Sequence, residues 1–207
     1  MSVPHGEPRK PFSARSIKDS SETAFRQLLY PLVRLLSSLK VRPDTLTVLG
    51  WTLAVGSAVL FGLGYARVAG AVMLLGGLFD ALDGAVARES DRSSAFGAFL
   101  DSTLDRLSES AVFVGIVFFY AASGLPLGAL LAGVAMTFSL LTSYARARAE
   151  GLGVECKVGI LERAGRVLLL SIFSMLGLLT AGLWLVAAGA LVTTAQRILH
   201  VNRATRG

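Results

Sequence analysis

Apolar residues dominate six stretches of the chain, and each stretch has about the length of one membrane-spanning helix. A helix needs about 20 mainly apolar residues to cross the hydrocarbon core of a bilayer. The stretches cover residues 46–66, 68–88, 95–121, 124–147, 160–182 and 184–201. The pattern therefore predicts an all-α integral membrane protein, in which residues 42–207 form one domain of six transmembrane helices.

The N-terminal part of the chain has a different pattern. Within residues 21–41, apolar residues recur at helical spacing, with Arg26, Arg34 and Lys40 between them and Pro31 as an interruption. A helix with an apolar and a basic face is suited to the membrane interface. We therefore expect an interfacial amphipathic helix over 21–41, with an ordinary soluble helix as the alternative, and a flexible tail over residues 1–20.

Composition and charge support a membrane protein. Of 207 residues, 53% are hydrophobic and 16% are charged, against about 25% charged residues in soluble domains. The links near residues 66–67, 121–125 and 181–184 contain Arg67 as their one charge, whereas the other links and both tails contain nearly all the Lys and Arg. This bias predicts a multi-pass protein of the cytoplasmic membrane with both termini in the cytoplasm.

The net charge of +6 alone is compatible with a nucleic acid or with an anionic membrane surface as the partner. The basic residues lie at the edges of the predicted spans and have no aromatic residues interleaved for stacking on bases. We therefore expect the lipid bilayer, and no nucleic acid, as a partner.

Four aspartates lie at the neighbouring ends of two predicted spans. Asp80 and Asp83 are three residues apart near the end of the second span, and Asp101 and Asp105 are four apart near the start of the third. Both spacings place a pair on one face of a helix. Because the link between the spans is short and polar, we expect an antiparallel hairpin that brings the four carboxylates to a similar depth, at the cytoplasmic side.

Carboxylates inside membrane spans normally belong to functional sites, because a charge there is unfavourable. Bound cations would relieve their mutual repulsion, and ligands that are all oxygen favour Mg²⁺, Mn²⁺ or Ca²⁺ over zinc. Two such ions close together commonly promote displacement at phosphorus. Gly84 and Gly97 leave room for a ligand near the backbone, and Arg88 is suited to contact a diphosphate. The alternative is a proton- or cation-coupled transporter.

The same segment resembles the signature of the CDP-alcohol phosphotransferases, which is D-x2-D-G-x2-A-R-x8-G-x3-D-x3-D. Its fixed positions are Asp80, Asp83, Gly84, Ala87, Arg88, Gly97, Asp101 and Asp105. The resemblance implies six transmembrane helices behind an interfacial helix, a homodimer, and two divalent cations, Mg²⁺ or Mn²⁺. It also implies that a CDP-activated lipid is the donor and that CMP and a phosphodiester lipid are the products.

The resemblance also assigns roles to single residues. Asp80, Asp83 and Asp101 would be the principal metal ligands, and Asp105 would both bind metal and act as the catalytic base for the acceptor hydroxyl. The segment from Pro43 to Thr47 resembles the part of the family that contacts the nucleotide. The site for CDP is thus expected to contain Asp44, Thr47, Asp80, Gly84, Arg88 and Gly97. Asp44 is equally suited to cap the first transmembrane helix.

Three arginines on the later spans suggest the acceptor. Arg146, Arg166 and Arg197 lie slightly inside the fourth, fifth and sixth predicted spans. If these spans converge, the arginines form a cationic pocket suited to a phosphate on the acceptor. They could instead be anchors at the cytoplasmic membrane edge.

The surrounding segments resemble the bacterial phosphatidylinositol-phosphate synthases. This resemblance places the acceptor-phosphate residues on Ser143, Arg146, Arg166 and Arg197, with Arg146 at a position where that branch has lysine. It implies transfer of a phosphatidyl group from CDP-diacylglycerol to inositol 1-phosphate. Within the family, phosphatidylglycerophosphate synthase and an enzyme with an archaeal-type lipid donor are the alternatives.

Overall fold

The computed structural model of the chain describes residues 30–34, 43–89 and 95–206. It divides into two units, Met1–Val41 and Arg42–Gly207. Of the first unit, residues 30–34 are described, and they are helical with Pro31 in their first turn. The predicted tail and most of the predicted amphipathic helix therefore lie outside the described residues.

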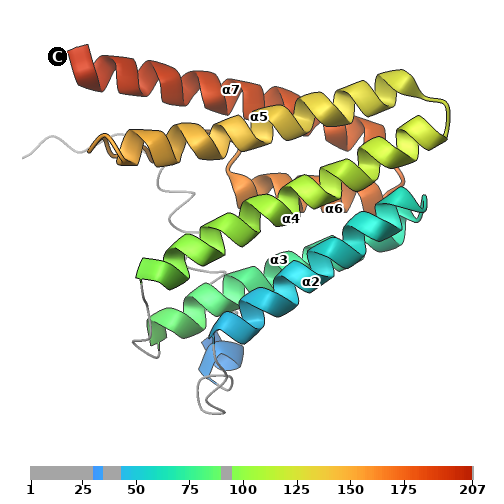
Figure 1. Ribbon diagram of the computed structural model, residues 1–207, viewed down its shortest axis with the longest axis horizontal. Helices are drawn as coiled ribbons and strands as arrows, with labels where there is room; N and C mark the ends of the chain where they lie inside the picture. The colour runs from blue at the N-terminus through green and yellow to red at the C-terminus, as the bar shows by residue number, and fades with distance from the viewer. Residues whose placement is uncertain (1–29, 35–42, 90–94, 207) are drawn as a thin grey trace, which may run out of the picture. The chain divides into compact units, whose positions relative to one another are not determined.

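The described residues of the second unit are mainly helical (Figure 1), and they contain no strand. The helices are α2 Pro43–Gly62, α3 Ala66–Glu89, α4 Ala95–Ala122, α5 Pro126–Glu150, α6 Arg163–Met175 and α7 Leu179–Arg206. The segment 151–162 between α5 and α6 is not helical. An all-helical fold is thus confirmed for the described part of the second unit.

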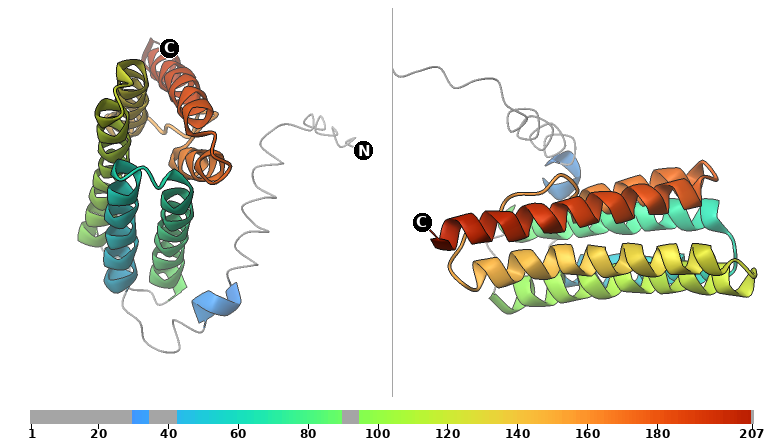
Figure 2. Two further views of the ribbon diagram at one scale, coloured as in Figure 1. Left: turned by 90° about the vertical axis from the view of Figure 1, so that its right-hand side faces the viewer. Right: turned by 90° about the horizontal axis from the view of Figure 1, so that it is seen from above.

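The six helices form a closed ring. In order around the ring, α2 contacts α3, which contacts α6, then α7, α5 and α4, and α4 contacts α2 again. Figure 2 shows the helices running nearly parallel or antiparallel to one another. The second and third predicted spans are antiparallel, as expected. Among the described helices, however, α3 and α4 make few contacts with each other, and both pack against α2 instead.

The core of the ring combines apolar side chains with very close helix contacts. Phe61, Phe113, Ile116, Leu170 and Leu183 are almost fully buried within it. Close contacts depend on glycine: a Cβ atom at Gly115 would overlap the backbone of Ala58, and one at Gly70 would lie 2.7 Å from the backbone oxygen of Ser171. Small residues allow membrane helices to approach in this way.

The outer surface and the helix lengths indicate a multi-pass membrane protein. Large apolar side chains such as those of Val59, Phe118, Leu130 and Trp184 are exposed, as expected for helices that face lipid. Among the described residues, four helices are long and apolar enough to cross a membrane by length and composition. Their candidate spans are Thr45–Gly62, Ala66–Val86, Pro126–Glu150 and Leu179–Arg206.

The other two helices differ from the predicted spans for clear reasons. α4 has 28 residues, but four charged residues lie close together in it, which are Asp101, Asp105, Arg106 and Glu109. α6 has only 13 residues, which gives a length of about 20 Å at 1.5 Å per residue, less than the ~30 Å hydrocarbon core.

The predicted boundaries 160–182 and 184–201 were wrong. Gly177 adopts φ +77°, a left-handed conformation that stops a helix and favours glycine. The fifth helix therefore ends at Met175, and the next begins at Leu179. The residues before Arg163 belong to the segment that is not helical, so the fifth helix is short at both ends.

Candidate active site

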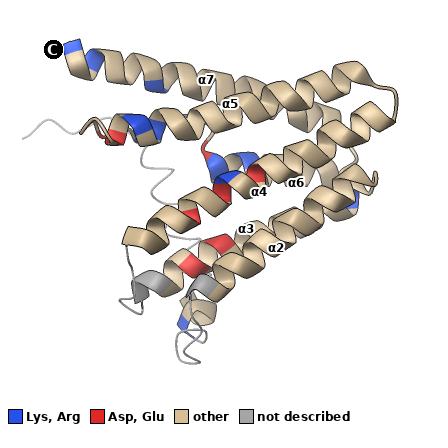
Figure 3. Ribbon diagram, in the orientation of Figure 1, with Lys and Arg blue, Asp and Glu red and all other residues tan. Residues whose placement is uncertain are grey.

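Acidic residues of α3 and α4 and basic residues of α6 lie towards one end of the ring (Figure 3). Asp80 and Asp83 lie on the last turns of α3, and Asp101 and Asp105 lie on the first half of α4. Asp105 interacts electrostatically with each of the other three aspartates. The structure thus brings the four predicted carboxylates into one region, in the space between two helices that do not pack closely against each other.

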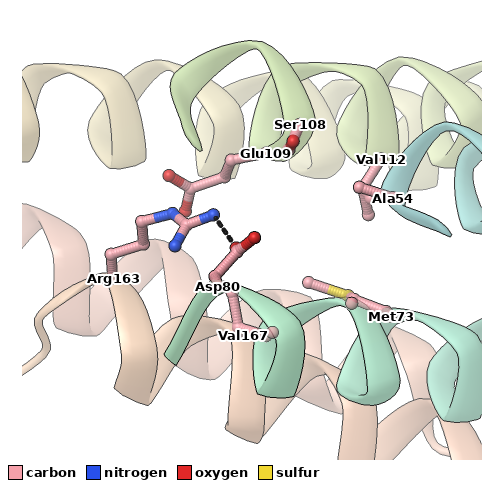
Figure 4. A pocket seen from close by; sticks show the side chains of 10 residues that line it. Ala54, Met73, Asp80, Ser108, Glu109, Val112, Arg163 and Val167 are labelled. Carbon is pink, nitrogen blue, oxygen red and sulfur yellow. Dashed lines mark hydrogen bonds and ion pairs between the residues drawn. The ribbon is translucent and has the colours of Figure 1, made fainter. Parts of the chain in front are cut away.

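Arg163, the first residue of α6, lies between two of these aspartates. Its Nη2 donates to Asp80 Oδ2 at 2.8 Å and forms an ion pair with Asp105 Oδ1 at 2.9 Å. The Nε atom of the same guanidinium is buried and has no hydrogen-bond partner. Figure 4 shows the guanidinium directed at Asp80 from α6, with Glu109 on the opposite side. One cation therefore already connects the carboxylates of α3 and α4.

A small pocket lies beside this ion pair. It is lined from four helices by Ala54, Met73, Gly76, Gly77, Asp80, Ser108, Glu109, Val112, Arg163 and Val167 (Figure 4). Most of these residues are apolar, so Asp80, Glu109 and Arg163 form a charged patch in a mainly apolar cavity. Electrostatic interactions are stronger in such surroundings than in water.

The helix α2 positions two of the aspartates. Thr47 donates its hydroxyl hydrogen to Asp83 Oδ2 at 2.6 Å, and Asp83 is 4% exposed. Gly50, one turn further along α2, lies against Asp80: a Cβ atom there would overlap Asp80 Oδ1. The start of α2 therefore supports the carboxylates of α3 through one hydrogen bond and one close contact.

The residues suit cations, although their present arrangement is not a complete metal site. Among the described residues, no three His, Cys, Asp or Glu side chains are close enough together to hold a metal ion. Nevertheless, a positive guanidinium group lies between Asp80 and Asp105, with Asp83 and Asp101 nearby. Carboxylate oxygens are the donors that Mg²⁺ and Mn²⁺ prefer. We therefore find that the donor set fits hard divalent cations.

The predicted CDP residues are only partly described. Thr47 contacts Asp83 as stated, Gly84 lies on α3 and Gly97 in the first turn of α4. The side chains of Asp44 and Arg88 lie outside the described part of the structure. α2 begins at Pro43, so Asp44 lies inside the first helical turn and the alternative of an N-cap at Asp44 was wrong. Proline favours the first helical position, because it lacks the backbone N–H that a helix leaves unpaired there.

Arg166 forms a buried ion pair that the sequence analysis did not predict. Its Nε donates to Glu109 Oε1 at 2.6 Å and its Nη2 donates to Glu109 Oε2 at 2.8 Å. Its Nη1 donates to the carbonyl oxygen of Leu161 at 3.3 Å. The two side chains are 2% and 3% exposed. All three guanidinium nitrogens of Arg166 thus have partners within the protein.

Arg197 is also buried, and within the described part of the chain its guanidinium donates to backbone carbonyl oxygens. It donates from Nη1 to the carbonyl oxygen of Thr142 at 2.6 Å and from Nε to that of Val158 at 3.0 Å. It interacts electrostatically with Arg146 and Arg166. The last turns of α5 and α7 and the segment 151–162 therefore meet around this arginine.

Arg146 is more accessible than the other two arginines. Its Nε donates to Glu150 Oε1 at 2.9 Å, and the two side chains are 40% and 47% exposed. Ser143, one turn earlier on α5, is half-buried. Arg197 thus interacts electrostatically with both other arginines, but each of the three has its own partner within the protein.

Three residues near the carboxylates had no predicted role in the site. Arg163, Glu109 and Gly50 were assigned no chemistry from the sequence. Glu109 had a detectable signal, because it lies four residues after Asp105 and so continues the acidic face of α4. The partners of Arg163 and the contact of Gly50 involve residues distant in sequence, and no local pattern marks them.

Comparisons with known proteins agree with this geometry. The sequence model of the CDP-alcohol phosphatidyltransferase family matches residues 40–196. The archaetidylinositol phosphate synthase of Methanothermobacter thermautotrophicus is 40% identical over 164 residues, which cover 76% of this chain and 82% of that protein. The phosphatidylinositol phosphate synthase of Mycobacteroides abscessus is 36% identical over 197 residues, which cover 90% and 89%.

Solved structures of a Mycobacterium tuberculosis phosphatidylinositol phosphate synthase have a similar fold. The structure with CDP-DAG bound is 33% identical, with a TM-score of 0.74 over 84% of this chain and 94% of that chain. A second structure, in complex with manganese and citrate, is 34% identical, with a TM-score of 0.74 over 83% and 87%. The similarity thus covers most of this chain and of its relatives.

Proposed function

The chain belongs to the CDP-alcohol phosphatidyltransferase family, and we propose that it transfers a phosphatidyl group from CDP-diacylglycerol to inositol 1-phosphate. The products are phosphatidylinositol phosphate and CMP. The observation that carries this proposal is the match over most of the chain to a phosphatidylinositol phosphate synthase solved with CDP-DAG bound. The enzyme is a transferase of phospholipid biosynthesis.

The four aspartates hold two divalent cations, Mg²⁺ or Mn²⁺, as the complex of the mycobacterial enzyme with manganese supports. When bound, such ions neutralise phosphate oxygens and stabilise the leaving group. Asp80, Asp83 and Asp101 are the principal ligands. Asp105 completes the ligand set and faces the acceptor.

The chemical step forms one P–O bond and breaks another. The acceptor hydroxyl oxygen attacks the phosphorus that bears the lipid, its proton passes to Asp105, and CMP leaves with the electron pair of the broken bond. A carboxylate beside bound cations stays ionised and can accept this proton. The geometry supports the role of Asp105, because it lies deeper along α4 than Asp101, towards Glu109 and Arg166.

The donor side of the site is built from α2, α3 and α4. Asp44, Thr47, Gly84, Arg88 and Gly97 contact the cytidine diphosphate part of the donor. The hydrogen bond from Thr47 to Asp83 supports this assignment, because it connects the proposed nucleotide segment directly to a proposed metal ligand.

The acceptor side is built from α5, α6 and α7. Ser143, Arg146, Arg166 and Arg197 bind the phosphate of the acceptor. Arg146 is the most accessible of these arginines. The buried Arg166 and Arg197 supply a positive field. They can donate to the phosphate only those guanidinium hydrogens that are not already bonded to the protein. The electrostatic interaction of Arg197 with both Arg146 and Arg166 supports one shared anion site.

We further propose that the chain crosses the cytoplasmic membrane six times, with the residues on both sides of the 13-residue α6 completing the fifth crossing. An amphipathic helix over 21–41 lies at the interface, and both termini and the active site face the cytoplasm. The protein works as a homodimer. The positions of Lys and Arg at the charged end of the ring support this orientation. Reaction of thiol probes with Tyr65→Cys and Arg203→Cys, each combined with Cys156→Ser, would test it in intact cells and inside-out vesicles.

The proposed reaction is tested with purified protein in lipid nanodiscs, Mn²⁺ or Mg²⁺, and a panel of donors and acceptors. We expect CMP release with CDP-diacylglycerol and inositol 1-phosphate, and none with free inositol. CMP release with glycerol 3-phosphate but not with inositol phosphate would contradict the assigned acceptor. The archaetidylinositol phosphate synthase relative makes the CDP-activated archaeal ether lipid a second donor to compare. A cation transporter would instead show metal flux without nucleotide turnover.

A further inference from the structure

Two arginines of α6 contact the acidic side of the ring, and they are held very differently. Arg166 is 2% exposed and uses all its guanidinium nitrogens in hydrogen bonds. Arg163 is 25% exposed, and its buried Nε lacks a partner. Arg163 is also the first residue of α6 and follows a segment without helical structure. Arg163 is therefore the more easily displaced of the two.

The position of Arg163 conflicts with metal binding. Its Nη2 lies 2.8 Å from Asp80 Oδ2 and 2.9 Å from Asp105 Oδ1, so this nitrogen lies between two carboxylates from different helices. A Mg²⁺ ion approaches its oxygen ligands to about 2.1 Å. A cation shared by these two oxygens would have to lie where the nitrogen lies. The guanidinium and the ion cannot both occupy that space, and their like charges repel.

The charges and positions of the four carboxylates are consistent with competition between Arg163 and metal ions. The single positive charge of Arg163 balances only one of the four aspartates, and two divalent cations would balance all four. With Arg163 in place, no three acidic side chains of the described residues are close enough together for a metal. Departure of Arg163 from Asp80 and Asp105 would free both carboxylates to turn towards the remaining two.

We propose that Arg163 is a substitute cation that holds Asp80 and Asp105 in the metal-free protein, competes with the divalent cations for these carboxylates, and leaves them when the cations bind. The arginine stabilises the acidic cluster before the metals arrive, and it lowers the affinity for them. This inference rests on the proposed two-metal function. It predicts a specific sign: removal of Arg163 tightens metal binding.

The test compares Arg163→Gln with the wild-type chain and with Arg203→Gln, which removes the same charge from the exposed last turn of α7. Purified full-length proteins are placed in nanodiscs of phosphatidylcholine, a lipid without net charge. Free Mn²⁺ is measured by electron paramagnetic resonance during titration. We expect Arg163→Gln to bind Mn²⁺ at least about fivefold more tightly than the wild type, and Arg203→Gln to match the wild type.

Thermal unfolding provides a second readout that does not depend on turnover. In EDTA, Arg163→Gln should unfold at a lower temperature than the wild type, because its carboxylates have lost their cation. Added Mn²⁺ should raise the unfolding temperature of Arg163→Gln more than that of the wild type. If Arg163→Gln does not fold, Arg163→Lys is measured in its place. Lysine keeps the positive charge but lacks the planar guanidinium, so we expect a smaller gain in Mn²⁺ affinity over the wild type than for Arg163→Gln.

The outcomes separate this inference from the proposed function. Equal or weaker Mn²⁺ binding by the Arg163 variant, with normal binding by the wild type, would overturn competition and leave a purely structural ion pair. Absence of Mn²⁺ binding in the wild type and in every variant would overturn the two-metal site itself, and the competition with it.

Discussion

The carboxylate side of the site, on α3 and α4, and its arginine side, on α6 and α7, differ in how their charges are paired. On α3 and α4, four negative charges share one region. Arg163 forms ion pairs with two of these carboxylates, and Thr47 donates a hydrogen bond to a third. On α6 and α7, Arg166 and Arg197 are buried with partners of their own, which are Glu109 and backbone carbonyl oxygens. The first side thus has unbalanced charge available for a ligand, whereas the second side is largely satisfied within the protein.

This difference shows which charged side chains are available to bind a ligand. A cluster of like charges in a membrane protein is stable only when something of opposite charge joins it. A buried arginine with a bidentate carboxylate partner has little left to give a ligand, and its removal affects folding as much as binding. The predictions below test each side in turn, from the largest expected effect to the smallest.

Replacement of the proposed base should have the largest effect on turnover. Asp105→Asn keeps the size of the side chain but cannot accept the proton, so we expect CMP release to fall by about 10²–10⁴-fold. Binding of CDP-diacylglycerol should largely survive. The control is Glu155→Gln, an exposed acid outside the cluster. A rate near that of the wild type would remove Asp105 as the base.

Breaking the buried ion pair should have the largest effect on stability. Glu109→Leu leaves Arg166 charged and unpaired, and we expect the free energy of unfolding to fall by about 3–5 kcal/mol. The double variant Glu109→Leu/Arg166→Leu should recover most of this loss, because an apolar pair fits the same site. Denaturant titration in mixed micelles measures both effects.

The double variant also separates folding from binding on the arginine side. If Arg166 contributes to the acceptor site, the double variant should fold but show a strongly raised KM for inositol phosphate. A double variant with normal KM would limit Arg166 to a structural role. Full stability of Glu109→Leu alone would mean that the pair does not stabilise the fold.

A methyl group at Gly50 should disturb the carboxylate side alone. The added Cβ atom would overlap Asp80 Oδ1, and the carboxylate would have to move away from α2. Since changes next to metal ligands typically weaken metal affinity 10–100-fold, we expect Gly50→Ala to lower Mn²⁺ affinity about 10-fold. The matched control is Gly56→Ala on the same helix, where a Cβ atom meets nothing within 4 Å. Equal effects of the two variants would contradict this contact.

Arg146 should give the smallest effect on stability and a selective effect on the acceptor. Its ion pair with Glu150 is exposed, so Arg146→Ala should change the free energy of unfolding by less than about 1 kcal/mol. Loss of a charged phosphate donor should raise the KM for inositol phosphate roughly fivefold and leave the KM for the donor unchanged. The control is the exposed neighbour Arg148→Ala. An unchanged KM in both variants would identify Arg146 as a membrane-edge anchor.

The sequence alone determined the features that depend on local periodicity. The helices of the membrane domain follow from apolar stretches of suitable length, and the carboxylate region follows from the spacing of Asp80 and Asp83 and of Asp101 and Asp105. Residues three or four apart share a helix face whatever the surrounding fold. The signature around them was sufficient to predict the family that the comparison confirmed.

The tertiary structure alone decided which charges meet. Arg163 and Asp80 are 83 residues apart, and Arg166 and Glu109 are 57 apart, so no periodicity along the chain connects them. Their contacts arise because α6 packs on α3 within a closed ring that also contains α4. The tertiary structure also shows the short α6, which ends where Gly177 turns the chain, and the narrow space that Gly50 leaves for Asp80. These features depend on how helices fit together, and that fit is set by contacts between distant residues.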